Sequence, residues 1–127
     1  MEYLKTFESY TFGREEFVEV TNPLSGEYCV VKAKIDTESY TSNIGAELAS
    51  MLNLYPDNEP KKVYSHLGER DLPVAKCQFT FNTGQQKGEK LDTEVTVGDR
   101  SKLRHKLAIG RKDLEKMGIL IDVRKSL

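Results

Sequence analysis

The chain has 127 residues, of which 38% are hydrophobic and 31% charged, and its formal net charge at pH 7 is -1. This is the length of one ordinary domain, so we expect a single domain over residues 1–127. The balanced charge excludes a general attraction to nucleic acid or to an anionic membrane. No apolar run approaches the ~20 residues that span a bilayer, and the first residues lack the core of a signal peptide. We expect a cytoplasmic protein without nucleic-acid or membrane partners.

The two cysteines and two histidines do not form a metal-binding pattern. A zinc site takes three or four ligands, usually with two of them close together in the sequence, and this chain has no such pair. Cys29 and Cys77 stand beside apolar and β-favouring residues, which predicts buried thiols in strands. Neither lies in a basic cluster that would favour a reactive thiolate. We therefore expect no metal, no cofactor and no cysteine nucleophile.

The first part of the chain has the pattern of two β-strands joined by a turn. Residues 16–20 alternate apolar and polar side chains, as a half-buried strand does. Residues 22–26 read Asn-Pro-Leu-Ser-Gly, which is typical of a turn. Residues 27–36 are more apolar, so we expect a central strand that ends at Asp36.

After Asp36 the apolar spacing changes from that of a strand to that of a helix. Asn43 is the predicted helix cap, and the helix ends near Leu54, because Pro56 follows. The side chains at helical spacing predict its buried face, which consists of Ile44, Leu48, Met51 and Leu52.

A hairpin and another strand are predicted next. Residues 62–65 and 72–81 have strand patterns, and residues 66–71 between them are interpreted as the hairpin tip, with Gly68 at its corner. Residues 82–90 are polar and predict a surface loop. Residues 93–97 alternate again as a strand.

The last part of the chain predicts a strand, a short helix and a final strand. Residues 106–109 are apolar and are closed by Gly110, which leads into a helix over residues 111–117. Gly118 stands where a helix commonly ends, and residues 119–123 have the apolar pattern of a strand. Many short strands and two short helices make the predicted fold mainly β.

Two apolar segments end in residues that a packed strand does not require. Residues 33–37 read Ala-Lys-Ile-Asp-Thr, and residues 107–114 read Leu-Ala-Ile-Gly-Arg-Lys-Asp-Leu. Burying the Asp36 carboxylate costs free energy unless it is hydrogen-bonded or used in chemistry. From the residues alone, a chain-turning role and a catalytic role for Asp36 both stay open.

The two segments together resemble the motifs of the retropepsin-like aspartic peptidases, and most closely the family labelled ATP-dependent zinc proteases. That family has a motif similar to Ala-Lys-Ile-Asp-Thr-Gly-Ala-x-Thr-Ser and a late motif with Asp-Arg followed by Leu-Leu-Gly-Arg-x-x-Leu. Here residues 33–42 read Ala-Lys-Ile-Asp-Thr-Glu-Ser-Tyr-Thr-Ser, and Asp99 and Arg100 precede residues 107–114. Residues 118–124 are similar as well, and residues 65–73 more weakly. The resemblance implies a mainly β, retropepsin-like acid protease closed barrel with one or two short helices.

The resemblance also implies an aspartic endopeptidase that acts on a peptide or protein substrate. Such an enzyme needs two carboxylates that share one proton, because like charges so close cannot both ionise. A short chain supplies one of them, so a homodimer would bring two copies of Asp36 to its axis. The resemblance assigns catalysis to Asp36 and Thr37, and substrate binding to Glu38, Ser39, Leu67 and Gly68. Thr37 would keep the two loops in register, and the hairpin tip would act as a flap.

A second Asp-Thr-Glu begins at Asp92, and we interpret it as chance. A two-lobed peptidase needs a second strand, helix and Gly-closed strand, which a chain of this length does not hold. The label of the family also finds no support in ATP chemistry, because the chain has no Gly-x-x-x-x-Gly-Lys-Ser/Thr loop.

The sequence departs from the family pattern beside Asp36. Glu38 stands where the family has Gly, Ser39 where it has Ala, and Tyr40 where it has Arg. Glycine at that position lets the backbone adopt an unusual geometry and lets substrate lie close. An alternative is therefore a catalytically impaired dimer of the same fold that serves as a binding or assembly module. A metal-dependent hydrolase is a third reading, which the lack of a His-Glu-x-x-His helix disfavours.

Three further features are interpreted as structural. Residues 100–106 hold the one basic cluster, which we expect to be a solvated face, with anion or nucleic-acid contact as the alternative. Arg111 is predicted to secure its helix by a salt bridge beneath the Asp36 loop. His66 is interpreted as an exposed loop histidine near the hairpin tip.

Overall fold

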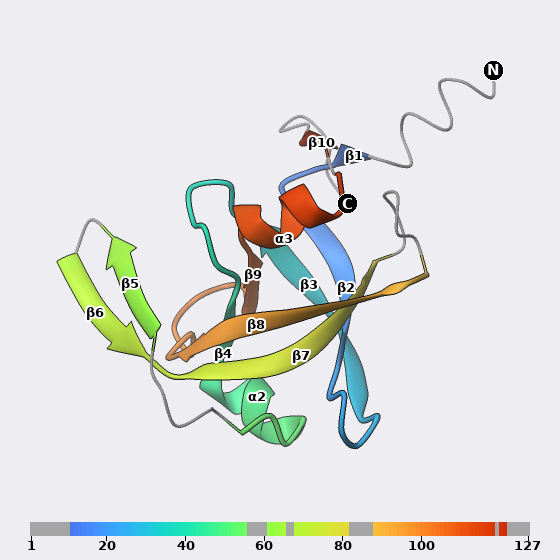
Figure 1. The fold of residues 1–127 in the computed structure, drawn as a ribbon, viewed down its shortest axis with the longest axis horizontal. Helices are drawn as coiled ribbons and strands as arrows, with labels where there is room; N and C mark the ends of the chain where they lie inside the picture. The colour runs from blue at the N-terminus through green and yellow to red at the C-terminus, as the bar shows by residue number, and fades with distance from the viewer. Residues whose placement is uncertain (1–10, 56–60, 66–67, 82–87, 119, 122–127) are drawn as a thin grey trace.

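Six strands close a barrel in the order β2-β3-β9-β4-β8-β7, and two small two-stranded sheets lie outside it (Figure 1). The computed structural model describes residues 11–55, 61–65, 68–81, 88–118 and 120–121. The barrel strands are β2 (Glu15–Thr21), β3 (Tyr28–Ile35), β4 (Asn43–Gly45), β7 (Val74–Phe81), β8 (Lys90–Gly98) and β9 (Leu107–Ile109). The small sheets pair β1 (Thr11–Phe12) with β10 (Leu120–Ile121), and β5 (Lys61–Ser65) with β6 (Gly68–Leu72). The helices of the described chain are α2 (Ala46–Met51) and α3 (Arg111–Lys116).

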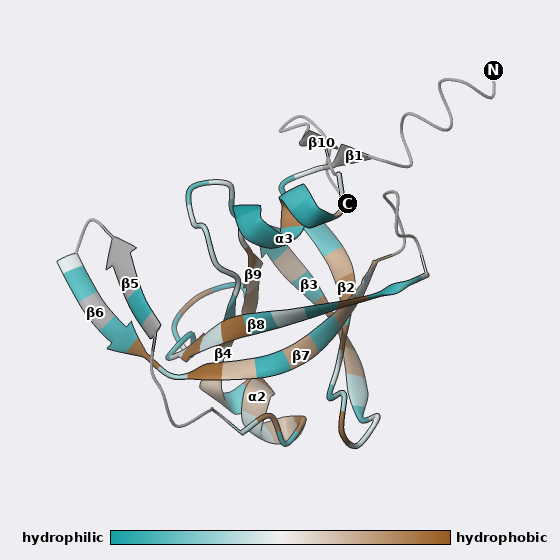
Figure 2. Cartoon of the chain, viewed as in Figure 1, coloured by the Kyte–Doolittle hydropathy of each residue, from teal (hydrophilic) through white to brown (hydrophobic). Residues whose placement is uncertain are grey.

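The long strands of the barrel form because their apolar residues recur at every second position. Val18 and Val20 of β2 and Phe79 and Phe81 of β7 all point into the core and are fully buried. The two phenylalanine rings meet edge to face, with centroids 6.0 Å apart. Figure 2 shows the alternation as bands along β7 and β8. The strands predicted at residues 16–20, 27–36, 93–97 and 106–109 are confirmed, with small changes at their ends.

The helix predicted after Asp36 begins later than the sequence suggested. Asn43 and Ile44 belong to β4, which pairs with β8 in parallel and with β9 antiparallel, so Asn43 is not the helix cap. Strand pairing on both sides decides the conformation of these residues over the local helical spacing. The helix α2 starts at Ala46 and buries Leu48, but Met51 is 71% exposed, so its assignment to the buried face was wrong.

The hairpin also differs from the expected one. Its second strand is β6, which pairs with β5 from Ser65↔Gly68 to Lys61↔Leu72. The predicted strand over residues 72–81 is therefore divided, and β7 begins only after Pro73, which has no N–H to donate to a ladder. The tip is correspondingly shorter than residues 66–71. Leu67 and His66 lie outside the described residues, as does most of the predicted loop at residues 82–90.

The strand β9 places two distant parts of the chain side by side. It pairs with β3 in parallel through Ile35↔Ile109, and with β4 antiparallel through Asn43↔Ala108. The chain leaves β3 at Asp36 and leaves β9 at Gly110, so both exits meet at one end of the barrel. The helix α3 follows at once and ends before Gly118, which has a φ of 64°, as predicted. No helix of the described chain is long and apolar enough to cross a membrane.

Candidate active site

The half-buried Asp36 lies immediately after β3, and its carboxylate is held by its own loop. The backbone N–H of Asp36 donates to the carbonyl of Ile109 at 2.9 Å, which continues the β3–β9 ladder by one residue. The backbone N–H of Glu38 donates to Oδ1 of Asp36 at 3.2 Å, and the Ser39 hydroxyl donates to Oδ2 at 3.1 Å. Both carboxylate oxygens are thus oriented by residues two and three positions further along the chain.

The start of α3 holds this loop from below. The N–H of Arg111 donates to the Ser39 carbonyl at 2.8 Å, and the N–H of Lys112 donates to the Tyr40 carbonyl at 2.9 Å. The first N–H groups of a helix have no acceptor within the helix, so the loop satisfies them. The Arg111 guanidinium donates to the Thr37 carbonyl at 3.1 Å and lies 5.8 Å from the centre of the Tyr40 ring. Arg111 therefore supports the Asp36 loop, as predicted, but through a backbone carbonyl and an aromatic ring. The predicted salt bridge was wrong.

Gly110 permits this close approach of helix and loop. A Cβ atom at this position would lie 2.6 Å from the carbonyl carbon and oxygen of Thr41, and equally near the carbonyl oxygen of Tyr40. Because all three are backbone atoms, no side-chain rotation would relieve the contact. Glycine is therefore required here by space, and its φ of -90° is ordinary.

A buried carboxylate that the sequence analysis did not single out lies beneath the loop. Asp113 of α3 is fully buried, and it accepts hydrogen bonds from the hydroxyls of Ser42 and Thr93, both at 2.5 Å. Ser42 in turn accepts the backbone N–H of Gly110 at 3.0 Å. The sequence signal that could have indicated this buried carboxylate is its place beside the apolar Leu114 in the first turn of a short helix. This network joins the Asp36 loop, α3 and β8.

Both cysteines lie in strands, as the sequence predicted, but only Cys77 is buried, so the predicted burial was wrong for Cys29. Burial raises the pKa of the Cys77 thiol to about 12, and the negative charge of Asp113 adds to the increase. Burial also raises the pKa of Cys29, which is partly exposed. Neither thiol is therefore poised as a thiolate at neutral pH. In the described part of the chain, no three His, Cys, Asp or Glu side chains group as metal ligands.

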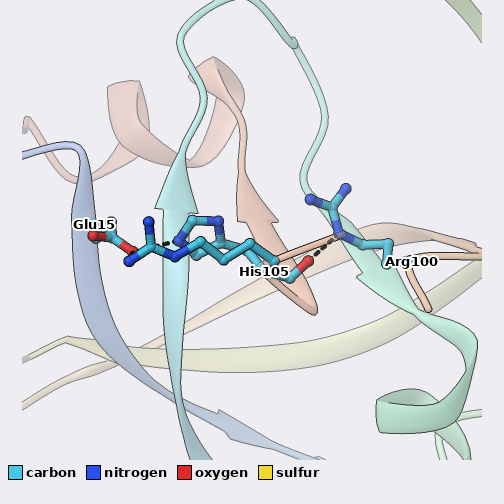
Figure 3. Close-up of polar contacts among 4 residues, drawn as sticks. Glu15, Arg100 and His105 are labelled. Atoms are coloured by element: carbon cyan, nitrogen blue, oxygen red, sulfur yellow. Dashed lines mark hydrogen bonds and ion pairs between the residues drawn. The ribbon is translucent and has the colours of Figure 1, made fainter. Parts of the chain in front are cut away.

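The basic cluster at residues 100–106 makes several hydrogen bonds within the protein, so it is not simply a solvated face. The Lys106 ammonium donates to the carbonyls of Arg100, Ser101 and Leu103, and so closes the loop between β8 and β9 on itself. His105 contacts Glu15 of β2 at 2.5 Å (Figure 3). The hydrogen bond from His105 lowers the pKa of Glu15, and the positive charge of Arg104 also contributes.

The structure brings four of the six predicted site residues together. Asp36, Thr37, Glu38 and Ser39 form one loop, in which the side chains of Thr37 and Glu38 are exposed. Gly68 lies at the outer end of the β5–β6 hairpin, which projects from the barrel (Figure 1), and has a φ of 101°.

A groove of about 500 Å³ lies elsewhere, between α3 and strands β7 and β8, and Asp36 does not line it. Asp92 lines this groove, is exposed, and accepts a hydrogen bond from the Gln78 amide at 2.7 Å. Asp92 of the second Asp-Thr-Glu therefore has different neighbours and different hydrogen bonds from Asp36.

Comparison with known proteins identifies the architecture. No family model and no curated protein matches the sequence. Among solved structures, EIAV protease complexed with the inhibitor HBY-793 has a TM-score of 0.62 and 14% identity, covering 88% of this chain and 94% of that one. The chain has a retropepsin-like fold. A DUF785 protein of unknown function from Legionella pneumophila is also similar, with a TM-score of 0.59 and 15% identity over 92% of this chain and 95% of its own.

The predicted fold class is thereby confirmed: a mainly β closed barrel with two short helices in the described chain. At 14% and 15% identity, the likeness extends to the fold and not to the function.

Proposed function

We propose that the chain is a single-domain, homodimeric aspartic endopeptidase in which each subunit contributes Asp36. The observation that carries this proposal is the carboxylate geometry: Asp36 stands at the exit of β3, with Glu38 N–H and the Ser39 hydroxyl on its two oxygens. The retropepsin-like fold, shared with a protease, supports it. A strand-end carboxylate that only turned the chain would not require a helix locked beneath its loop by Gly110.

The chemistry requires two copies of the site. One ionised Asp36 would take a proton from a water molecule, which attacks the peptide carbonyl, while the protonated partner Asp36 donates to the carbonyl oxygen. Each chain holds one such carboxylate, so the site is complete only when a two-fold axis joins two loops. The exposed Thr37 would hold the loops in register. Glu38, Ser39 and the hairpin tip with Leu67 and Gly68 would contact substrate.

The proposal is tested by mass-spectrometric cleavage profiling of a mixed peptide library between about pH 4 and 7, because a shared proton sets such an optimum. Wild type is compared with Asp36→Asn and with Asp92→Asn, the matched change in the exposed second Asp-Thr-Glu. We expect Asp36→Asn to abolish cleavage and Asp92→Asn to retain it. Sedimentation of all three proteins checks the dimer. Cleavage that survives in Asp36→Asn would refute the assignment.

The exposed Glu38 favours a second candidate function. Its backbone N–H donates to the Asp36 carboxylate, so the Glu38 side chain belongs to the same loop. Two copies of Glu38 at a dimer axis would add two negative charges there. Such charges would hinder a second Asp36 from approaching in ionised form. The second candidate is a dimeric binding or assembly module without catalysis. A stable wild-type dimer that cleaves nothing in the library would favour it, and cleavage that depends on Asp36 would eliminate it.

A further inference from the structure

One edge of β3 is open over most of its length. The short strand β9 pairs with β3 only at Lys34 and Ile35, and no other strand of the described chain pairs with that side of β3 (Figure 1). Residues 28–33 therefore have a neighbouring strand, β2, on one side only. An edge of this kind presents a row of backbone N–H and C=O groups that another strand can bind.

The hydrogen bonds at the end of β3 show which backbone groups this edge presents. The N–H of Ile35 donates to the Arg14 carbonyl, on the β2 side, at 2.8 Å. The N–H of Asp36 donates in the opposite direction, to Ile109 of β9, at 2.9 Å. Since the direction alternates along a strand, the even-numbered residues present their N–H and C=O groups to the open edge, and these are Tyr28, Val30 and Lys32. In the described chain, these groups have no hydrogen-bond partner.

The side chains beside this edge are largely apolar. The even-numbered side chains of β3 lie on the outer face of the barrel, where Tyr28 is 64% exposed and Val30 is 58% exposed. Lysines on an edge commonly prevent it from pairing with another molecule. The Lys32 ammonium, however, lies 5.6 Å from the centre of the Phe17 ring on β2, which turns it away from the edge. Two exposed apolar side chains thus lie beside the open backbone groups.

A second copy of the chain fits this edge in an antiparallel alignment. A two-fold axis at Cys29 places Tyr28 opposite Val30 of the partner subunit, and Val30 opposite Tyr28 of the partner subunit. Both residues present an N–H and a C=O to the edge, so each pair would exchange two hydrogen bonds. An aromatic and a β-branched side chain that lie opposite each other across two strands also stabilise the pairing.

The fold disfavours the neighbouring alignments. With the axis at Val30, Gly26 of the partner subunit would lie opposite Lys34, where Ala108 of β9 already pairs. With the axis at Tyr28, Val30 would face Gly26 of the partner subunit, whose N–H is already bonded within its own turn at 2.8 Å. An axis between two residues would set a residue that faces the edge opposite one that faces β2. The alignment about Cys29 therefore makes the largest overlap.

We propose that the open edge of β3 binds the same edge of a second copy of the chain, in antiparallel pairing about Cys29. This pairing would place the two Asp36 loops at opposite ends of the paired strands, so it is distinct from the proposed active dimer. A chain that used both two-fold interfaces would form assemblies larger than a dimer. The edge pairing does not rest on the proposed function.

Disulfide trapping tests the alignment. Opposite residues of a pair without mutual hydrogen bonds have Cα atoms about 4.5 Å apart, which is within the range of a disulfide. We expect brief oxidation with copper phenanthroline to link the partly exposed Cys29 to Cys29 of the partner subunit. The variant Cys29→Ser, which retains Cys77, should form no link. Wild type that associates but forms no Cys29 link overturns the inference.

A matched variant tests the register on the same face of the strand. Val31→Cys in the Cys29→Ser background moves the thiol by two residues, so that it would lie roughly 13 Å along the strand from its symmetry-related copy. It should therefore not be linked. A link formed equally well by Val31→Cys would show random collision or another alignment, and would overturn the inference.

Sedimentation velocity over a range of concentrations tests the association itself. Val30→Lys removes an apolar contact on both sides of the axis, so we expect association to weaken about tenfold or more. Val30→Pro removes the edge N–H, which makes no hydrogen bond in the described chain, and should act in the same way. Met51→Lys is the control, because Met51 is 71% exposed but lies on α2. If wild type and both Val30 variants sediment alike at every concentration, the inference is overturned. Peptide cleavage that depends on Asp36 should persist in Val30→Lys, so the two proposals are tested separately.

Discussion

The substitution Gly110→Ala tests how the Asp36 loop is built. The added methyl group would lie 2.6 Å from three backbone atoms of Thr41 and Tyr40, well inside the distance that carbon and oxygen atoms tolerate. Neither the loop backbone nor the helix start can rotate away from it. The substitution must therefore push α3 and the Asp36 loop apart.

The free energy involved follows from the contacts that cross this junction. The backbone N–H groups of residues 110–112 donate to the Ser42 hydroxyl and to the carbonyls of Ser39 and Tyr40. Each such hydrogen bond contributes about 1 kcal/mol net, and overpacking of a tight site costs about 1–3 kcal/mol. We expect Gly110→Ala to lower the free energy of unfolding by about 3 kcal/mol. For a domain of this size, that is a fall in Tm of roughly 10–15 °C.

Urea and thermal denaturation measure the effect, with Gly98→Ala as the control. A Cβ at Gly98 would lie 3.3 Å from the Asn43 amide nitrogen, which is the end of a side chain and can move. We expect the control to lose less than about 1 kcal/mol. If Gly110→Ala unfolds within about 0.5 kcal/mol of wild type, the steric argument is wrong, because the loop and helix then separate at no cost.

Two further predictions concern the polar contacts around the site. Asp113→Ala should lower the free energy of unfolding by about 3 kcal/mol, since the hydroxyls of Ser42 and Thr93 would lose their acceptor, and wild-type stability in urea would contradict this. Glu15→Gln tests the contact with His105: the pKa of Glu15 is lowered in the fold, so the ionised carboxylate stabilises the protein above its ordinary value near 4.5, and this is lost as the pH falls through the lowered value. The Tm advantage of wild type over Glu15→Gln should therefore shrink in acid, and a difference independent of pH would count against the contact.

The sequence by itself determined the elements whose pattern is local. The alternation in β2 and β3 and the turn between them needed no distant partner, because the two-residue period records which face of a strand is buried. The helix α3 was equally readable from Gly110 at its start and Gly118 at its end. The motif around Asp36 also indicated the fold, which the solved structures confirm.

The local pattern was misleading where pairing with distant strands decides the conformation. Ile44 fits a helical face by spacing, yet β8 and β9 hold it in a strand, and Met51 on the same predicted face is exposed. Pro73 lies between β6 and β7, so the apolar run predicted as one strand over residues 72–81 belongs to two strands. The backbone partners of Ile44 lie far away in the sequence, whereas β6 pairs with β5, which directly precedes it.

Only the tertiary structure decided what surrounds Asp36. The strand β9 lies between β3 and β4, and this crossing brings Gly110, Asp113 and the Arg100 loop to the residues that follow β3. Asp113 and Arg100 look like ordinary surface charges in the sequence, because burial and partners are properties of the assembled barrel. The sequence thus identifies the carboxylate and the neighbouring residues that bind its oxygens, whereas the helix start that holds its loop and the close approach at Gly110 arise from contacts between residues distant along the chain.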